Sequence, residues 1–472
     1  MMTREQNAFM TLTGEADAAG KLLRRTWQPA ALLEELDDRR PLKALRLLGQ
    51  DLVLFRDDTG RLGLIDRDCP HRGADLAFGR LEDGGVRCLF HGWLFDVAGN
   101  CLDTPAEPPG SMLCKRVRQR SYPVRVVSGI IFAYLGEGTP PAMPALDCFA
   151  APDTHVFAFK GHFDCNWLQA LEVGIDPAHA SFLHRFFEDA DAAANYGRQF
   201  RATSADSEMT MTQVLREYTQ PTIHVEKSAL GLRIAALRAL EGGSTHVRVT
   251  NLVFPQAFVI PLSSEMTITQ WHVPIDDKSC YWYAIFTSFT GPVDKAEMRR
   301  QRLQLYTLPD YKSRLGRHND YGYDLIEQKT RTYTGMGEDI NVHDQWAVES
   351  QGTIQDRTRE HLGTTDRAIV AYRKLLLVEI RKAQAGEVTM LDLDAAAAAR
   401  LAGPATIDGV AADGDWSTYL SRADGRRRAA ASWQAAVVDD AAHVGDVGSS
   451  GDAGGRGGDG GLGDVGGLGG AA

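Results

Sequence analysis

The stretch DCPHRGADLAFGRLEDGGVRCLFHGWLFD, residues 68–96, carries two cysteine–histidine pairs of unequal spacing. Cys69 and His71 form a C-x-H pair, and after 16 further residues Cys88 and His91 form a C-x₂-H pair. Short apolar runs around these pairs are broken by Gly, Asp and Pro, a pattern typical of β strands joined by tight turns. The sequence therefore predicts an all-β module in which two neighbouring loops each present one thiolate and one imidazole to a metal.

Two cysteines and two histidines are the ligands of a Rieske [2Fe–2S] centre, in which the cysteines hold one iron and the histidines hold the other. Structural zinc uses the same set, but zinc fingers pair C-x₂₋₄-C with H-x₃₋₅-H. Mixed pairs in a β context favour the cluster. Respiratory Rieske proteins have a further cysteine in each loop, joined as a disulfide. Neither loop has a spare thiol here, and Cys101, ten residues beyond His91, has no partner in the first loop. The pattern thus favours the oxygenase and ferredoxin branch.

A second metal site is indicated by DCNWLQALEVGIDPAHASFLHRFFED, residues 164–189. His179 and His184, together with one carboxylate, would leave positions on Fe(II) open for O₂ and substrate. Residues five apart differ by about 140° around an α-helix, so the helix must bend, bulge or end between the two histidines. Pro177 suits a helix that starts just before His179.

The carboxylate ligand is expected in or just before residues 340–361, which follow much later in the chain. Asp344 and Glu349 are the first candidates, and Asp344 is expected to begin a helix. Three further carboxylates stand behind them, namely Glu338, Asp339 and Asp356.

The remaining pattern predicts an α+β fold. Residues 139–146 (TPPAMPAL) carry three prolines and indicate a linker. Strands rich in β-branched and aromatic residues are expected at 246–262, 266–273 and 280–289, and a helical pattern from 295 to 383. Residues 445–472 hold 14 glycines in 28 positions and are expected to be disordered. We therefore expect a leader (1–26), an all-β cluster domain (27–145), an α+β catalytic domain (146–385) and a C-terminal extension (386–472).

Residues 20–385 resemble the Rieske non-haem iron aromatic-ring-hydroxylating oxygenases, in particular the large (α) subunit of the phthalate 4,5-dioxygenase-like group. The patterns C-x-H-x₁₆-C-x₂-H and D-x-x-H-x₄-H match that family, and DQWAVESQGTIQDR (344–357) is similar to its third-ligand helix. The resemblance implies a helix-grip-like catalytic domain with an antiparallel sheet, and it makes Asp344 the third iron ligand. It further implies that Asp176 bridges the mononuclear iron site to a Rieske histidine across a subunit boundary, in a trimer or stacked trimers. Residues 386–472 match nothing in the family.

This resemblance implies an oxidoreductase with one [2Fe–2S] cluster and one Fe²⁺ per chain. The expected reaction is O₂-dependent hydroxylation of a small aromatic substrate, with electrons from NAD(P)H through a separate reductase that carries a flavin and an iron–sulfur centre. O-demethylation and attack on a diaryl ether are alternatives. No glycine fingerprint for a dinucleotide follows any expected strand, which fits a separate reductase.

An aryl carboxylate of phthalate type is the expected substrate, because relatives in this group act on aromatic acids. An anion in an apolar pocket favours arginine as its partner. Arg248 lies in the middle of an expected strand and is the first candidate for this contact. Arg198, Arg201 and Arg216 are weaker candidates.

Composition excludes several other classes of protein. The formal net charge of −11 disfavours binding to nucleic acid. The N-terminus lacks an apolar signal region, no apolar run is long enough for a membrane span, and the seven scattered cysteines do not form a disulfide framework. We therefore expect a cytoplasmic protein. Two competing hypotheses are an electron-transfer protein without catalysis, which would not need His179 and His184, and a zinc-containing regulator or scaffold.

Overall fold

The structure is a computed structural model that describes residues 2–37, 39–189, 203–262, 264–412, 414–431 and 433. The glycine-rich segment 445–472, expected to be disordered, lies outside the described residues, as do Arg198 and Arg201. None of the helices in the described part of the chain combines the length and apolar composition that a membrane span requires.

The N-terminal module consists of three small antiparallel sheets, as the alternation of apolar runs and turn residues predicts. Two short helices, α1 (Arg4–Thr11) and α2 (Ala18–Leu23), precede it. Its sheets are, in spatial order, β1 (Gln28–Leu32), β10 (Ile130–Ala133) and β9 (Val124–Val127); β2 (Leu42–Leu47), β3 (Gln50–Arg56) and β4 (Leu62–Asp66); and β5 (Arg80–Glu82), β6 (Gly85–Arg87), β7 (Leu94–Asp96) and β8 (Cys101–Asp103).

Strand β3 belongs to two hydrophobic cores at once. Successive side chains of a strand point to opposite faces. Val53 and Phe55 therefore pack into a small core around the cysteine–histidine loops, whereas Leu52 and Leu54 pack into the main core of the chain. This is why β3 is an unbroken apolar run rather than an alternating one.

The second part of the chain is built on one eight-stranded antiparallel sheet. The expected strands form in it, because their β-branched and aromatic residues pack on both faces. The order is β11 (Val156–Phe163), β17 (Cys280–Ser288), β16 (Met266–Pro274), β15 (Ala257–Pro261), β14 (Thr245–Val253), β13 (Gly231–Ala239) and β12 (Thr222–Ser228), and β20 (Ile407–Ala411) pairs with β14 beside β15.

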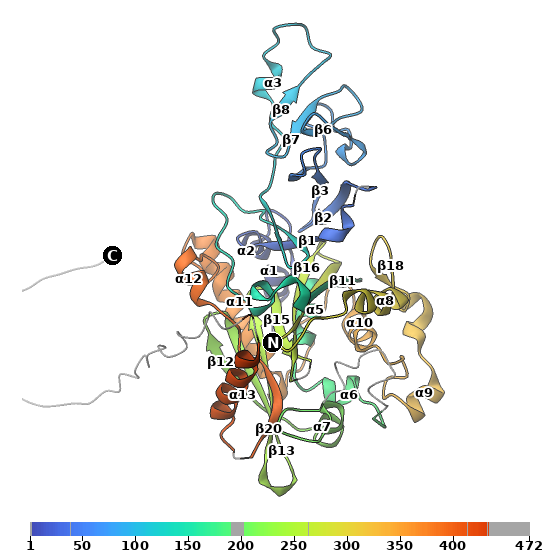
Figure 1. Cartoon of the computed structure of the whole chain (residues 1–472), viewed down its shortest axis with the longest axis vertical. Helices are drawn as coiled ribbons and strands as arrows, with labels where there is room; N and C mark the ends of the chain where they lie inside the picture. Colours follow the sequence, from blue (N-terminus) through green and yellow to red (C-terminus); the bar gives the residue numbers. More distant parts are fainter. Residues whose placement is uncertain are drawn as a thin grey trace, which may run out of the picture. The chain divides into compact units, whose positions relative to one another are not determined.

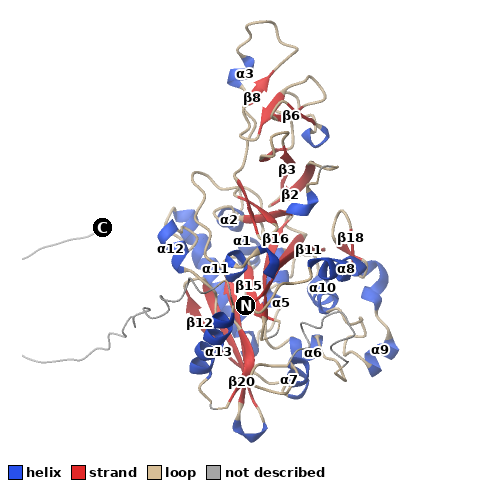
Figure 2. Ribbon diagram, in the orientation of Figure 1, coloured by secondary structure: helices blue, strands red, loops and turns tan. Residues whose placement is uncertain are grey.

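Helices border this sheet (Figure 2). Helix α5 contacts β15, β16 and β17, and α11 contacts β12, β13 and α2. The region expected to be helical from 295 to 383 contains four α-helices. The helices of this part are α5 (Trp167–Gly174), α6 (Ala180–Leu183), α7 (Met211–Glu217), α8 (Lys295–Leu305), α9 (Leu325–Thr330), α10 (Ile340–Ser350), α11 (Arg367–Ala385), α12 (Ala395–Arg400) and α13 (Trp416–Ala430).

The structure differs from the expected boundary at residue 385. Strand β20 pairs with β14 in register from Thr245↔Ala411 to Val249↔Ile407, and α13 packs on both strands. Figure 1 shows these C-terminal elements, coloured orange and red, against the strands of the sheet. The described residues beyond 385 thus complete the catalytic sheet. A five-residue strand whose partner lies about 160 positions earlier has no local signal of its own, so the sequence pattern missed it.

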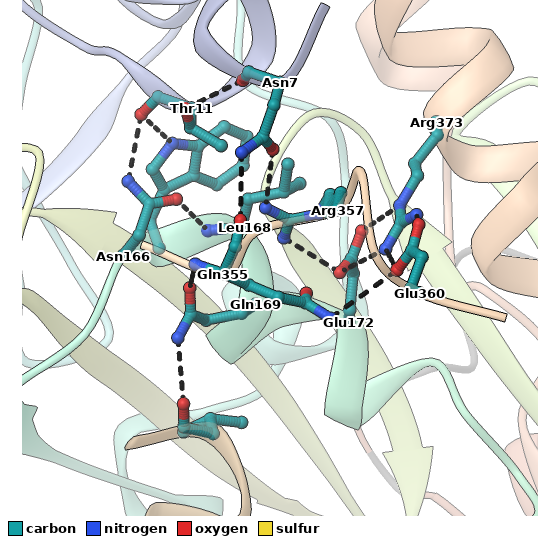
Figure 3. Close-up of polar contacts among 12 residues, drawn as sticks. Asn7, Thr11, Asn166, Leu168, Gln169, Glu172, Gln355, Arg357, Glu360 and Arg373 are labelled. Carbon is teal, nitrogen blue, oxygen red and sulfur yellow. Dashed lines mark hydrogen bonds and ion pairs between the residues drawn. The ribbon is translucent and has the colours of Figure 1, made fainter. Parts of the chain in front are cut away.

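A buried carboxylate, Glu172 of α5, joins three distant segments (Figure 3). Arg373 Nε and Nη2 donate to its two oxygens at 2.6 and 2.9 Å, and Arg357 Nη2 donates at 2.9 Å. Glu360 also accepts from Arg373, so two guanidinium groups face two carboxylates. Burial raises the pKa of Glu172, but Arg357 and Arg373 outweigh burial and hold the pKa below its usual value.

Replacing Glu172 by Gln should reduce the free energy of unfolding by about 3–5 kcal/mol, because two buried guanidinium groups lose their shared counter-charge. The measurement is urea unfolding at pH 7. Since the folded pKa of Glu172 is lowered, its contribution in wild type is present above about pH 4.3 and is lost as the pH falls through the lowered pKa. The control is Glu226→Gln in an exposed pair with Arg233, which should cost less than about 1 kcal/mol. Equal losses in both variants would contradict a structural role for the Glu172 network.

Candidate functional site

The two cysteine–histidine loops have the same backbone geometry, although their sequences are spaced differently. In each loop the cysteine amide donates to the carbonyl five residues later, and the amide four residues later donates back to the cysteine carbonyl. The four bonds, 2.8–3.0 Å long, are Cys69–Ala74, Gly73–Cys69, Cys88–Trp93 and Gly92–Cys88. Gly73 and Gly92 close the turns with φ of 73° and 76°, in the left-handed region that favours glycine.

The side chains of the two loops point at one another. The Cys69 and Cys88 thiols are buried and interact with each other. The His71 and His91 rings lie with centroids 4.4 Å apart, and His71 is stacked on Trp93 at 4.3 Å. His91 Nδ1 is buried without a hydrogen-bond partner in the described part of the chain. Two thiols and two imidazoles with an unsatisfied ring nitrogen fit a [2Fe–2S] cluster.

The second site begins where α5 ends. Gly174 lies so close to strand β15 that a Cβ there would meet the Phe258 ring at 1.9 Å, so only glycine allows this approach. The chain then passes through Pro177 to the single turn of α6, with His179 at its N-cap and His184 at its C-cap. A bend, a bulge or a helix end was expected between histidines five apart; the structure instead has a helix that consists only of the four residues between them.

Three atoms with free lone pairs converge at this turn. His179 Nε2 lies 3.2 Å from His184 Nε2, and Asp344 Oδ1 lies 3.2 Å from His184 Nε2 and 3.8 Å from His179 Nε2. The carbonyl of Asp176 accepts from His179 Nδ1, which places the ring hydrogen on Nδ1 and leaves Nε2 free. Asp344 Oδ1 is buried with no hydrogen-bond donor among the described residues. A cation is the group that satisfies all three atoms.

The local electrostatics also fit a divalent cation. Burial lowers the pKa of His179, so this ring is neutral near pH 7. Burial raises the pKa of Asp344, but His184 and His179 outweigh burial and hold its pKa below the usual range. The group thus offers two imidazoles and one carboxylate, the facial ligand set of non-haem Fe(II) enzymes.

The other candidate carboxylates are occupied elsewhere. Asp339 caps α10 through the amide of Asn341, Glu349 accepts from the Tyr321 hydroxyl at 2.7 Å, Glu338 pairs with Arg331, and Asp356 accepts from Thr358. Because Asp339 caps α10, Asp344 lies in the second turn of this helix. The sequence pattern had placed Asp344 at the start of the helix, and that prediction was wrong.

The carboxylate of Asp176 lies beside the first histidine. Its Oδ1 accepts from the Ala178 amide at 2.8 Å, and its Oδ2 lies 3.9 Å from His179 Nδ1. The sequence analysis missed His343, whose Nδ1 lies 3.5 Å from His184 Nδ1 and whose Nε2 donates to the Gly337 carbonyl at 3.0 Å. Burial lowers the pKa of His343 to about 4, so this ring supports His184 as a neutral group. The position of His343 directly before Asp344 was a signal in the sequence that could have identified it.

A pocket opens from the three ligand atoms onto one face of the sheet. Alternate residues of three strands line it, as the two-residue period of a strand requires. They are Arg248 and Thr250 of β14, Phe258 and Ile260 of β15, and Ile268, Gln270 and His272 of β16. Arg248 thus lies in the lining of this pocket. Its contact with the substrate stays a prediction. Arg216 is not among the pocket-lining residues that the structure describes. Its Nη2 instead lies 2.9 Å from Asp189 Oδ2.

Comparison with known proteins gives two matching family models. The Rieske [2Fe-2S] domain matches residues 26–123, and the model described as LigXa C-terminal domain like matches residues 133–432. The oxygenase subunit of phthalate 4,5-dioxygenase from Pseudomonas putida is 35% identical over 89% of this chain and 95% of its own. Phenoxybenzoate dioxygenase subunit alpha from Ectopseudomonas oleovorans is 30% identical, over 80% of this chain and 85% of its own.

A solved structure shares the fold. The terminal oxygenase of carbazole 1,9a-dioxygenase from Nocardioides aromaticivorans IC177 superposes with a TM-score of 0.53 at 18% identity, covering 80% of this chain and 97% of its own. The chain therefore belongs to the Rieske non-haem iron oxygenases and is an oxidoreductase that carries a [2Fe–2S] cluster and a mononuclear iron. Within that class it falls in the phthalate 4,5-dioxygenase-like group of large (α) subunits.

These findings confirm the expected family, fold class and cofactors. They correct one point, because the LigXa-like match continues to residue 432. The expectation that nothing after residue 385 matches the family was wrong for the segment that holds β20 and α13. This segment belongs to the fold through the pairing of β20 with β14, and it carries no local motif that would reveal it.

The purified protein should contain about three irons and two acid-labile sulfides per chain, two irons in the cluster and one at the mononuclear site. Metal analysis and the visible and EPR spectra test this. Cys88→Ala should lose the sulfide and the cluster spectrum. Cys148→Ala should keep both, because Cys148 is a buried cysteine outside the loops. Stoichiometric zinc without sulfide in wild type would contradict the assignment.

Proposed function

We propose that this chain is the terminal oxygenase of a multicomponent system that hydroxylates an aryl carboxylate of phthalate type with O₂. The observation that carries the proposal is the convergence of His179, His184 and Asp344 at a largely apolar pocket that also contains Arg248. Relatives named for phthalate, 3-chlorobenzoate and phenoxybenzoate support the substrate class.

In this proposal Cys69 and Cys88 hold one iron of the cluster and His71 and His91 hold the other. The mononuclear iron is held by the Nε2 atoms of both site histidines and by Asp344 Oδ1. When bound, the two metal centres supply stored electrons and a site for O₂ activation. The domains are a Rieske domain at 27–145 and a catalytic domain that begins at 146.

The protein's own residues supply binding, orientation and exclusion of water. Phe258, Ile260 and Ile268 form an apolar wall against which an aromatic ring packs. Arg248 binds the substrate carboxylate from the same face of the sheet, because a guanidinium matches a carboxylate in geometry and charge. The carbonyl of Asp176 fixes the tautomer of His179, and the neighbouring carboxylate orients that ring.

The electron source in this proposal is NAD(P)H, through a separate reductase with a flavin and an iron–sulfur centre. The proposed assembly is a homo-oligomer, a trimer or stacked trimers, in the cytoplasm. Asp176 then lies at the boundary where a Rieske histidine of a neighbouring subunit approaches His179. Its partly exposed carboxylate, 22% accessible, is available for such a contact.

A second candidate is oxidative attack on an aryl ether, either O-demethylation or diaryl-ether cleavage. One relative, 28% identical over 82% of this chain, is named as the oxygenase subunit of 5,5'-dehydrodivanillate O-demethylase. Gln270 and His272 place a neutral polar pair in the pocket, with Gln270 Nε2 3.0 Å from His272 Nε2, where an ether or hydroxyl oxygen finds a partner.

Turnover assays distinguish the two candidates. The holoenzyme with a surrogate reductase and NADH should convert aryl carboxylates to products heavier by two oxygens and two hydrogens, as dihydroxylation requires. Loss of CH₂ from methoxybenzoates, or splitting of phenoxybenzoate, would favour the second candidate. Absence of product from every arene would contradict both.

His184→Ala should lower the iron content from about three to about two per chain and abolish product formation, while the cluster spectrum stays unchanged. The cluster loops have their own core, so loss of the second site leaves them folded. His224→Ala, on exposed strand β12, is the matched control and should keep all iron. A colourless His184→Ala protein would show that the two sites are not separable.

Asp176→Asn should retain both metals but slow reoxidation of the reduced cluster by O₂ and substrate about 100-fold. Asn accepts a hydrogen bond from the Ala178 amide nearly as well as Asp, so a residue that only holds this turn would tolerate the change. A bridge between imidazoles needs the charge, because charge-assisted hydrogen bonds are the stronger ones. Stopped-flow single turnover measures the rate. Asp356→Asn, at an exposed turn, controls for loss of one charge. A wild-type rate in Asp176→Asn would leave Asp176 with a role only in the turn before α6.

A further inference from the structure

Arg238 of strand β13 is a buried arginine that contacts the turn of the two site histidines. Its side chain is 1% exposed. Its Nη2 donates to the Pro177 carbonyl at 3.3 Å and, more weakly, to the Ser181 hydroxyl at 3.5 Å. Pro177 lies two residues before His179, and Ser181 lies two residues after it. One guanidinium therefore holds the chain on both sides of this histidine.

The same guanidinium also holds helix α7. Arg238 Nε donates at 2.8 Å to the carbonyl of Tyr218, the C-cap residue of α7. A helix C-terminus favours a positive charge, because its last carbonyls lack partners within the helix. Helix α7 contacts α6, and its Met211, Thr212 and Leu215 line the pocket. Arg238 thus joins the sheet to the histidine turn and to the helix beside that turn.

The other hydrogen bonds of the histidine turn are local. His179 Nδ1 donates to the Asp176 carbonyl, the Ala178 amide donates to the Asp176 carboxylate, and the Ser181 amide donates to the Ala178 carbonyl. Among the described residues of the sheet, Arg238 alone forms hydrogen bonds with residues 176–181. A helix of one turn is not stable by itself, so it needs a contact from outside.

The charge of Arg238 is costly in this position. Its neighbour Arg248 pairs with the buried carboxylate of Asp408 at 2.8 Å, whereas Arg238 forms no ion pair within the described part of the chain. Burial, and after it the charge of Arg248, lower the pKa of Arg238 to about 10, so its guanidinium is protonated at pH 7. A buried charge costs free energy. The side chain offsets this cost through its planar fork of donors, which reaches acceptors on separate elements.

We propose that Arg238 is a positioning residue for the mononuclear iron site. Its bonds to Pro177 and Ser181 hold the turn against β13, so that the Nε2 atoms of His179 and His184 converge at 3.2 Å. The inference rests on the proposed function, in which these two histidines hold the iron. It adds a residue that contacts neither the iron nor the substrate, and on which the affinity for iron depends.

The physical basis is preorganisation of the ligands. A metal that binds to a turn already held in place does not have to offset the entropy of ordering that turn. Groups that orient metal ligands from outside the ligand set typically change the affinity for the metal 10- to 100-fold when they are replaced. Loss of the Arg238 contacts should therefore weaken iron binding, although all three ligands remain.

The test measures the dissociation constant of Fe(II) for Arg238→Lys and Arg238→Gln. Chelation removes the mononuclear iron from the holoenzyme while the cluster is retained, and Fe(II) is then titrated without oxygen. Both variants should bind Fe(II) at least about 10-fold more weakly than wild type. Gln removes the charge. Lys keeps the charge, but its single ammonium group lacks the fork that spans the Tyr218 and Pro177 carbonyls.

Arg233→Gln is the matched control, because Arg233 lies on the same strand in an exposed pair with Glu226. Its dissociation constant should equal that of wild type. Urea unfolding of the iron-depleted proteins is measured beside the titration, and the visible spectrum checks the cluster. A purely structural role would lower the free energy of unfolding but leave the dissociation constant of the folded protein unchanged.

Hydrogen exchange of wild type tests the inference without a variant, and it serves if Arg238→Gln fails to fold. The amides of Phe182 and Leu183 donate to the His179 carbonyl and report on the turn. After removal of the mononuclear iron they should exchange at most about threefold faster than in the loaded protein, because Arg238 still holds the turn. In iron-depleted Arg238→Lys they should exchange at least about 10-fold faster than in iron-depleted wild type.

The outcomes separate the inference from the proposed function. A smaller change of the dissociation constant in either variant, or a larger effect of iron removal on exchange in wild type, overturns the inference. If His184→Ala keeps the third iron, the ligand assignment fails and the inference fails with it. If the Arg238 variants lose affinity as expected but no arene is converted, the inference stands and the proposed hydroxylation fails.

Discussion

The five-residue spacing of His179 and His184 constrains the whole catalytic half of the chain. Two imidazoles at this spacing do not share one face of a regular α-helix, and here the helix between them is reduced to a single turn. That turn requires α5 to stop at once, which the contact of Gly174 with Phe258 allows. Helix α10 then brings Asp344 Oδ1 to 3.2 Å from His184 Nε2. The sheet, the broken helix and the returning helix are thus parts of one geometric requirement.

Local motifs carried most of what the sequence could predict. The cysteines and histidines of both metal sites follow from short spacings, and the strands at 246–289 follow from β-branched and aromatic runs. Asp344 was chosen over Glu349 only through the family resemblance. The features that the sequence could not predict depend on contacts between residues far apart in the chain. Strand β20 has its partner about 160 residues away, and Asp408 gains meaning only through Arg248. The start of α10 could not be predicted, because Asp339 and Asp344 are both suitable N-cap residues. The structure has Asp339 as the cap, which puts Asp344 in the second turn.

The two halves of the molecule are joined through shared packing rather than through a simple linker. The hairpin of β3 and β4 places Val53, Phe55 and Ile65 against the cluster loops and Leu52, Leu54 and Leu64 against the main core. In addition, the amide of Leu48 donates to the Pro274 carbonyl at 2.9 Å, at the end of β16. The cluster loops are therefore held at a defined place relative to the sheet that bears the pocket.

The late position of β20 in the chain fixes the order in which the pocket is completed during synthesis. Domains generally fold as units while the chain emerges from its N-terminus, so the cluster module and the strands up to β17 are available first. Pairing of β20 with β14 closes a long loop, and such contacts form slowly. Until then Arg248 faces the nascent pocket without its counter-charge. A nascent chain that stops short of residue 407 would hold all seven metal ligands, yet its Arg248 would lack the ion pair with Asp408 that the complete chain has.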